Sequence, residues 1–255
     1  MSAWKLVALG TISALALTGC GGGGEAGSGG TPAAAVAFPV DTTTAATITG
    51  TVRFAGTRPT LARIDMSEEA TCAGKHPNGA FSEVAVVNSN GTLANVFVYV
   101  KEGLDAGLTF PVPREAVTIN QDGCIYHPRV FGIQVGQTLN IQNSDGLLHN
   151  IKAVPTANRP FNISQPTNMT TSRTFTTPEI MVPLECNVHS WMNAFVGVTT
   201  HPYHATTGAD GSFTIRRLPP GTYTLEIWHE RFGVQTQQVT VGASESKTVA
   251  FTVRG

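Results

Sequence analysis

The chain has 255 residues, a formal net charge of −1 at pH 7 and 13% charged residues. This composition lacks the basic footprint of a nucleic-acid-binding protein, so we expect no nucleic-acid partner. The sequence also lacks a Gly-rich phosphate loop, a nucleophile elbow and a paired-His zinc helix, which argues against the enzyme classes that use them. Its length suits one larger domain and one small domain.

Residues 1–19 have the pattern of an export signal. Lys5 supplies a positive charge, and the apolar run at 6–17 is too short to span a bilayer but has the length of a signal-peptide core. The run ends in Leu-Thr-Gly-Cys, which resembles a bacterial lipobox, so we expect Cys20 to become the lipidated N-terminus. An ordinary secretory peptide or an uncleaved apolar helix is the alternative. The expected location is the cell envelope, facing the periplasm or in the outer membrane if the host is Gram-negative.

Residues 20–46 follow as a stretch of Gly, Ala, Thr and Ser with almost no large side chains. Such a composition cannot bury enough apolar area to offset the entropy of ordering the chain. A flexible chain of this length has an end-to-end distance of roughly 25–30 Å. We therefore expect a tether between the lipid and the folded part.

From residue 47 onward, short alternating or β-branched runs are separated by Gly, Pro, Asn and Asp. Strands at this spacing predict an antiparallel sandwich, and no segment has the pattern of a long amphipathic helix. The fold is therefore predicted to be all-β. The expected strands are 48–54, 84–87, 96–100, 117–119, 130–135, 139–141, 151–154, 173–176, 180–184, 195–199, 212–216, 223–228, 234–241 and 248–253.

The pattern changes at about residue 203. The stretch Asp-Gly-Ser-Phe-Thr-Ile at 210–215, followed by Leu-Pro-Pro-Gly-Thr-Tyr-Thr-Leu at 218–225, resembles the carboxypeptidase regulatory-like, transthyretin-like module. That resemblance implies a small β-sandwich over 203–255, which serves as a structural or interaction domain. The strand at 48–54 is one that this module could share with the preceding domain.

The most informative motif is at 186–192, which reads Cys-Asn-Val-His-Ser-Trp-Met, and a further His-Asn pair stands at 149–150. One thiolate, two imidazoles and one thioether are the donors of a mononuclear electron-transfer copper site, in which Met is a weak axial ligand. Structural zinc more often recruits additional Cys or a carboxylate. The alternative is a buried free thiol near two histidines that only form hydrogen bonds.

This loop resembles the ligand loop of the plastocyanin-like cupredoxins, and its shortness is most similar to the amicyanin type. In that family the upstream His is commonly followed by Asn, whose side chain helps tie the two ligand-bearing segments together. The resemblance implies a Greek-key cupredoxin sandwich over 47–202. It also implies one type 1 copper ion, and no dinuclear centre because the loop holds a single Cys. The implied ligands are His149, Cys186, His189 and Met192.

Two cysteines, Cys72 and Cys124, remain once one has been assigned to lipid and one to copper. Export places them in an oxidising compartment, so we expect a disulfide between them. The alternative is a zinc site that uses two thiolates and two imidazoles, from Cys72, His76, Cys124 and His127. His201 follows the strand that leaves the copper loop, and its role as a neighbour of the site or a replacement ligand stays open.

We therefore expect an exported, lipid-anchored blue copper protein that transfers single electrons between redox partner proteins. It is not expected to be an enzyme, because a copper reductase would need a second copper cluster with more paired His. A copper delivery lipoprotein, or a surface interaction lipoprotein with a vestigial metal site, is the alternative. The resemblance also implies that the loop His189 shows its ring edge through an apolar patch where partners dock, beside Trp191. Trp191 covering the core is the competing interpretation.

Overall fold

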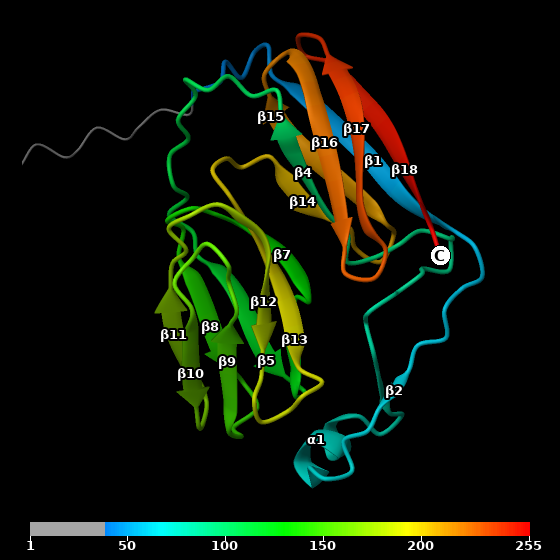
Figure 1. Ribbon diagram of the computed structural model, residues 1–255, viewed down its shortest axis with the longest axis vertical. Coiled ribbons are helices and arrows are strands. Elements are labelled where there is room, and N and C mark those ends of the chain that lie inside the picture. Colours follow the sequence, from blue (N-terminus) through cyan, green and yellow to red (C-terminus); the bar gives the residue numbers. More distant parts are fainter. Residues whose placement is uncertain (1–38) are drawn as a thin grey trace, which may run out of the picture. The chain divides into compact units, whose positions relative to one another are not determined.

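The computed structural model describes residues 39–255. The predicted export signal, Cys20 and most of the predicted tether lie outside the described residues. Within the described part the chain is built almost entirely of strands, and α1 (Ala70–Lys75) is its only helix (Figure 1). The prediction of an all-β fold is confirmed. No helix among residues 39–255 is long and apolar enough to cross a membrane.

The first sandwich comprises β5 to β13. Its five-stranded sheet has the order β10-β9-β12-β13-β7, and its four-stranded sheet has the order β11-β8-β5-β6. Buried residues of both sheets, such as Ile119 and Val196, belong to one apolar core, so the two sheets pack face to face. The strands are β5 (Val117–Asp122), β6 (Ile125–His127), β7 (Val130–Gln134), β8 (Leu139–Asn143), β9 (His149–Ala153), β10 (Phe161–Gln165), β11 (Met169–Arg173), β12 (Glu179–Glu185) and β13 (Asn193–Thr199).

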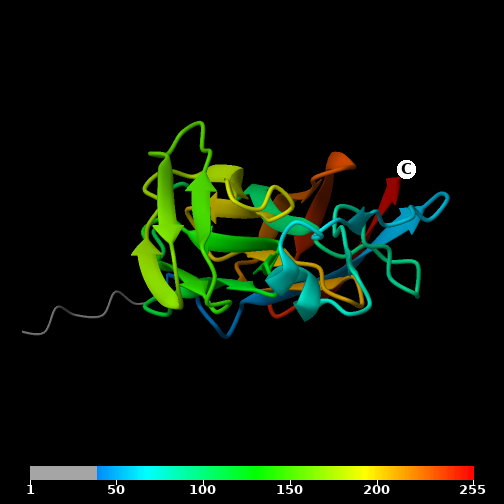
Figure 2. The same ribbon diagram turned by 90° about the horizontal axis from the view of Figure 1, so that it is seen from below.

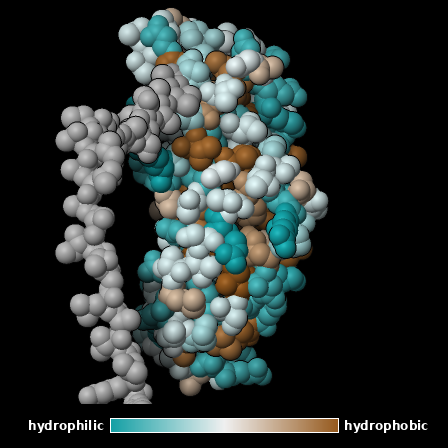
Figure 3. Space-filling view, turned by 90° about the vertical axis from the view of Figure 1, so that its left-hand side faces the viewer, coloured by the Kyte–Doolittle hydropathy of each residue, from teal (hydrophilic) through white to brown (hydrophobic). Residues whose placement is uncertain are grey.

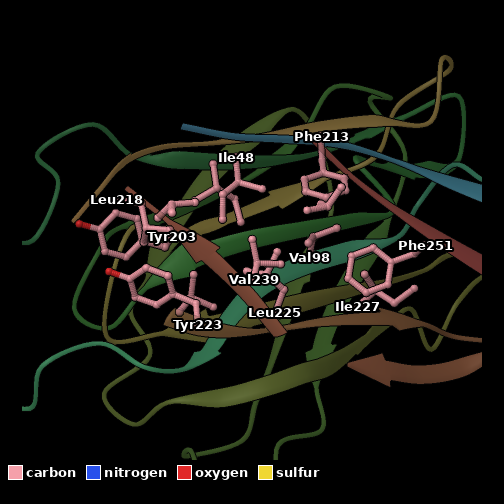
Figure 4. Packing of buried hydrophobic residues seen from close by; sticks show 14 of the residues in the cluster. Ile48, Val98, Tyr203, Phe213, Leu218, Tyr223, Leu225, Ile227, Val239 and Phe251 are labelled. Atoms are coloured by element: carbon pink, nitrogen blue, oxygen red, sulfur yellow. The ribbon is translucent and has the colours of Figure 1, made fainter. Parts of the chain in front are cut away.

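The second sandwich has sheets of order β15-β1-β18 and β14-β4-β16-β17. Every second residue of β1 from position 46 to 52 is buried, as expected of a strand with one face on a core. Figure 4 shows this core, in which Phe213 and Phe251 lie at one end and Tyr203 and Tyr223 at the other. The strands are β1 (Ala46–Ala55), β4 (Phe97–Glu102), β14 (His204–Thr206), β15 (Ser212–Leu218), β16 (Gly221–His229), β17 (Gly233–Val241) and β18 (Ser246–Arg254).

The two cores divide the chain differently from the expected ranges 47–202 and 203–255. β1 pairs with β15 and β18, and β4 pairs with β14 and β16, so both early strands belong to the second sandwich. The first sandwich is therefore inserted between β4 and β14. The physical reason is that β1 is the central strand of its sheet, and without it β15 and β18 would have no hydrogen-bonding partner. Strand 48–54 therefore lies, as part of β1, within the second sandwich, and its strand partners β15 and β18 both belong to that sandwich.

Some expected strands differ from those observed. Residues 84–87 form only an isolated bridge between Val87 and Leu93. The strand expected at 173–176 lies earlier, as β11, and ends at Arg173. Five short strands were not expected from the sequence, because few of their residues are both apolar and buried: β2 (Arg63–Ile64), β3 (Ala80–Phe81), β6, β10 and β14.

The segment between β1 and β4 contains a small substructure, residues 62–82, which we call the cap segment. It consists of β2 (Arg63–Ile64), α1 and β3 (Ala80–Phe81), and β2 pairs with β3. A disulfide joins Cys72 in α1 to Cys124 in the first sandwich. His76 Nε2 also lies 2.6 Å from the carbonyl oxygen of Gly123. Figure 2 shows the turns of α1 from below. The cap segment is thereby fastened to the β5–β6 turn.

The described residues 39–255 belong to one compact unit, and specific contacts join its two sandwiches. The guanidinium of Arg129 donates two hydrogen bonds, of 2.6 and 2.7 Å, to the carboxylate of Glu230. Phe97 and Tyr99 of β4 pack in one apolar cluster with Val130 and Met181 of the first sandwich. The face drawn in Figure 3 carries mostly polar side chains with apolar residues in small separate groups. Nothing on the visible part of that face marks it as a large apolar docking surface.

Candidate metal centre

The structure brings three of the four predicted ligands together. The donor atoms of His149, Cys186 and His189 all lie within 4.8 Å of one another, and all three residues are buried. The Nδ1 atoms of the two imidazoles are 2.9 Å apart, and Cys186 Sγ is 4.0 Å from His189 Nδ1. His149 begins β9, whereas the other two residues lie in the β12–β13 loop. One thiol and two imidazole nitrogens therefore face a common point.

The ligand loop 186–192 is closed by its own hydrogen bonds. The backbone N–H of Cys186 donates to the carbonyl of Met192 at 3.1 Å, and the N–H of Met192 donates to the carbonyl of His189 at 3.0 Å. The N–H of His189 donates to Cys186 Sγ at 3.4 Å. Met192 is 1% exposed and belongs to the same core cluster as Cys186. The thioether side chain is thus buried with the other predicted ligands.

Asn150 connects the two ligand-bearing segments. Its Oδ1 accepts a hydrogen bond of 2.6 Å from the backbone N–H of Asn187 and lies 3.4 Å from Cys186 Sγ. Its Nδ2 donates to Asn162 Oδ1 at 2.6 Å. Its backbone carbonyl accepts a hydrogen bond of 2.5 Å from the hydroxyl of Tyr126. The expected tie between the His-Asn pair and the ligand loop is confirmed.

The surroundings of Cys186 and His189 lower the pKa of both side chains. Burial alone would raise the pKa of Cys186, but hydrogen bonds from the His149 side chain and from the backbone N–H groups of Asn150, His189 and Val188 outweigh burial and lower the pKa. Burial and the neighbouring His149 lower the pKa of His189, which favours its neutral form. Metals bind the thiolate and the neutral imidazole, so these two shifts favour ligation.

The pKa of His149 moves the other way. Burial would lower it, but interactions with Cys186 and with the carboxylate of Asp145 outweigh burial and raise it. Asp145 Oδ2 lies 2.8 Å from His149 Nε2, and Asp145 Oδ1 forms an ion pair of 2.7 Å with Lys75 of the cap segment. Neither Asp145 nor Lys75 was among the site residues expected from the sequence. An acidic residue four positions before the His was the one signal for this contact.

The expected exposure of His189 is not found. His189 is 4% exposed, and its Nε2 lies 3.9 Å from the Sγ of Cys72 in the cap segment. The ring of Trp191 lies beside it with a centroid separation of 5.1 Å, and Trp191 Nε1 donates to the carbonyl of Cys124 at 2.9 Å. The prediction was wrong because the disulfide-bound cap covers the ring edge. Trp191 packs against the core of the first sandwich, as the competing interpretation held.

The remaining predicted groups can also be placed. The Cys72–Cys124 disulfide, with Cα atoms 5.6 Å apart, uses both thiols that the alternative zinc site would need. His201 Nδ1 accepts a hydrogen bond of 3.2 Å from the backbone N–H of Tyr203, and its ring stacks on the ring of Tyr203. His201 is not part of the donor clusters found among residues 39–255.

Comparison with known families defines the class of the C-terminal part. Residues 192–254 match the family model of the carboxypeptidase regulatory-like domain. The predicted resemblance of this region is therefore confirmed. The match begins at Met192, within the ligand loop, rather than at the expected boundary at 203. No curated protein matches the chain.

Solved structures that resemble part of the chain include copper proteins. A Cu-containing nitrite reductase from Thermus scotoductus is 22% identical with a TM-score of 0.31, over 38% of this chain and 25% of that chain. A purple cupredoxin from Nitrosopumilus maritimus is 23% identical with a TM-score of 0.28, over 32% of this chain and 99% of that chain. A mutant of amicyanin is 18% identical with a TM-score of 0.30, over 40% of this chain and 97% of that chain. The matched region spans a quarter of the reductase chain.

Proposed function

We propose that the chain binds one type 1 copper ion and transfers single electrons between redox partner proteins. The observation that carries the proposal is the convergence of one buried thiol and two imidazole Nδ1 atoms on a common point. Together with a buried thioether from the same loop, this is the donor set of blue-copper centres. The proposed ligands are His149, Cys186, His189 and Met192.

The residues of the chain account for the main requirements of such a centre. A bound copper ion would supply the one-electron couple, and the protein would supply a fixed and dry set of donors. Burial of all four side chains excludes water from the site. The hydrogen bonds of the ligand loop and of Asn150 hold the donors in one arrangement. A site that changes little between oxidation states needs little reorganisation when an electron arrives or leaves.

The proposal extends to location and partners. The lipobox-like sequence supports lipidation of Cys20 and anchorage in the cell envelope, with the membrane contacted through the lipid alone. Among residues 39–255, one donor group combines a free thiol with two imidazoles, and a mononuclear site of this kind supports an electron carrier rather than an enzyme. The carboxypeptidase regulatory-like region would be a structural or interaction module.

Retention of copper through a redox cycle separates this function from copper delivery. A soluble Cys20→Ala form would be loaded with copper, reduced with ascorbate, reoxidised with ferricyanide and desalted after each step. An electron carrier keeps one copper per chain in both states in the presence of a competing Cu(I) chelator. Loss of the metal on reduction would instead identify a delivery protein, and failure to bind stoichiometric copper would identify a vestigial site.

A further inference from the structure

The side chain of Asp145 is fully buried beside a proposed ligand. It lies in the loop between β8 and β9, and four donors surround its carboxylate. Oδ1 accepts from the backbone N–H of Gly123 at 2.7 Å and pairs with Lys75 Nζ at 2.7 Å. Oδ2 accepts from the backbone N–H of Cys124 at 2.8 Å and lies 2.8 Å from His149 Nε2. The β5–β6 turn and α1 therefore hold this carboxylate in place.

The contact with His149 has a defined polarity. A carboxylate held by two backbone N–H groups and an ammonium acts as an acceptor, so the proton of the shared hydrogen bond belongs on His149 Nε2. In a neutral imidazole this leaves the lone pair on Nδ1. Nδ1 is the atom that faces His189 Nδ1 at 2.9 Å. The free lone pair is thus directed at the common point of the donors.

We propose that Asp145 is a positioning residue of the metal site, which holds His149 in the Nε2–H tautomer, and that Lys75 of the cap segment holds Asp145. This inference rests on the proposed metal site. Carboxylate partners of this kind fix the orientation of a ligating imidazole and increase its basicity. A more basic donor stabilises Cu(II) relative to Cu(I), so Asp145 lowers the reduction potential. The cap segment then acts on both imidazoles, on His149 through Lys75 and on His189 through Cys72.

The substitution Asp145→Asn tests the proposal with little change in shape. If the amide nitrogen faces His149, two donors meet and the imidazole must move its proton to Nδ1. If the amide oxygen faces His149, the amide nitrogen takes the place of Oδ1 and meets two other donors, the N–H group of Gly123 and the ammonium of Lys75. Long-range 1H–15N NMR of the metal-free protein should show Nε2–H in the native chain and loss of that tautomer in the variant. Copper(II) affinity should fall by about 10–100-fold, and the reduction potential should rise.

Two further variants serve as controls. Glu115→Gln removes an exposed carboxylate just before β5 and should leave both the tautomer and the affinity unchanged. Lys75→Met should keep the Nε2–H tautomer and weaken copper binding less than Asp145→Asn does. Native metal-free protein in which the neutral His149 imidazole carries its proton on Nδ1, measured at a pH above the raised pKa of His149, would overturn the proposal, and this result can be read even if Asp145→Asn does not fold. An Asp145→Asn protein with unchanged tautomer and affinity would also overturn it. An Nε2–H tautomer in a protein that shows no blue copper band would refute the electron-carrier function and leave the positioning role intact.

Discussion

At the scale of single residues, the donors of the proposed site are held by neighbours that differ in kind. Cys186 is held by backbone N–H groups and Asn150, whereas His149 is held by a buried carboxylate. Met192 has a buried side chain, and its hydrogen bonds to Cys186 and His189 are made by its backbone. The thioether is therefore the donor that a substitution can change with the least disturbance to the others.

Met192→Leu should retain copper and raise the reduction potential. The axial bond to a thioether is weak, so its loss leaves three strong donors in place. Leu has a volume similar to that of Met, and such exchanges usually cost less than about 1.5 kcal/mol of stability. Copper stoichiometry and voltammetry of the variant provide the measurement. Loss of the metal would show that Met192 is a main ligand or that the loop depends on it.

At the scale of elements, the loop between β9 and β10 is held by one acidic residue of β12. Glu179 accepts hydrogen bonds from the backbone N–H groups of Thr156, Ala157 and Asn158, at 2.5, 3.0 and 3.0 Å. Burial alone would raise the pKa of Glu179, but these hydrogen bonds and those of the Thr156 and Asn158 side chains lower it to about 2. The loop therefore depends on an ionised carboxylate.

This pKa predicts a loss of stability in acid. Because the folded-state pKa of Glu179 lies below its ordinary value of 4.5, the stabilisation is fully present above about pH 4.5 and disappears as the pH falls towards about 2. After a discount for partial exposure, the contribution is roughly 1–2 kcal/mol. The free energy of unfolding, measured by urea denaturation, should therefore fall between pH 5 and pH 2. Glu179→Gln should remove most of this pH dependence, because a shift of one pKa unit corresponds to ~1.36 kcal/mol. Glu185→Gln in the same strand is the matched control, and an equal loss of slope there would contradict the assignment.

The cap segment is the main difference between the observed site and the expected one, because it covers His189. The Cys72–Cys124 disulfide closes a sequence separation of 52 residues. In the chain-entropy model a loop of that length contributes about 4 kcal/mol to stability. The same disulfide places a sulfur atom against His189 Nε2. It therefore links the stability of the chain to the covering of a ligand.

Replacing both cysteines, as Cys72→Ala with Cys124→Ala, should lower the free energy of unfolding by about 2–4 kcal/mol. It should also expose His189, because the sulfur that covers Nε2 is removed. Diethyl pyrocarbonate labelling of the metal-free protein with peptide mass spectrometry measures that exposure, and His127, exposed in the native chain, serves as the internal reference. Equal protection of His189 in both proteins would show that other residues cover it.

At the scale of the whole molecule, the first sandwich is inserted into the second. β1 and β18 run parallel over the pairs from Thr47–Ser246 to Ala55–Arg254, so the first and the last strand of the described part are neighbours in one sheet. The proposed metal site belongs to the inserted sandwich. An anchor on the N-terminal side would therefore attach to the second sandwich, through the residues before β1.

Cys20→Ala should move the protein from the membrane fraction to the soluble fraction. The reason is that a lipid on this residue would be the only membrane attachment proposed for the chain. Fractionation of cells that produce each form provides the measurement, with Ser28→Ala as a control inside the predicted tether. Equal membrane association of Cys20→Ala and the native chain would refute the lipobox interpretation.

The donor residues of the proposed site could be selected from the sequence, whereas their surroundings could not. Cys186, His189 and Met192 lie within seven residues, and their chemistry limits the metals that they suit. Asp145 and Lys75 come together only because the β5–β6 turn and a disulfide bring distant segments into contact. The alternation of β1 was visible, but its partners lie far along the chain, and local patterns do not encode which strands pair.

The absorption spectrum of the copper-loaded protein tests the central claim most directly. A soluble Cys20→Ala form with one equivalent of Cu(II) should show an intense blue band from sulfur-to-copper charge transfer. Cys186→Ser should abolish the band, because Cys186 is the free cysteine among the described residues and the other two are joined in a disulfide. A colourless one-to-one copper complex, or a blue band that persists in Cys186→Ser, would contradict the proposed site.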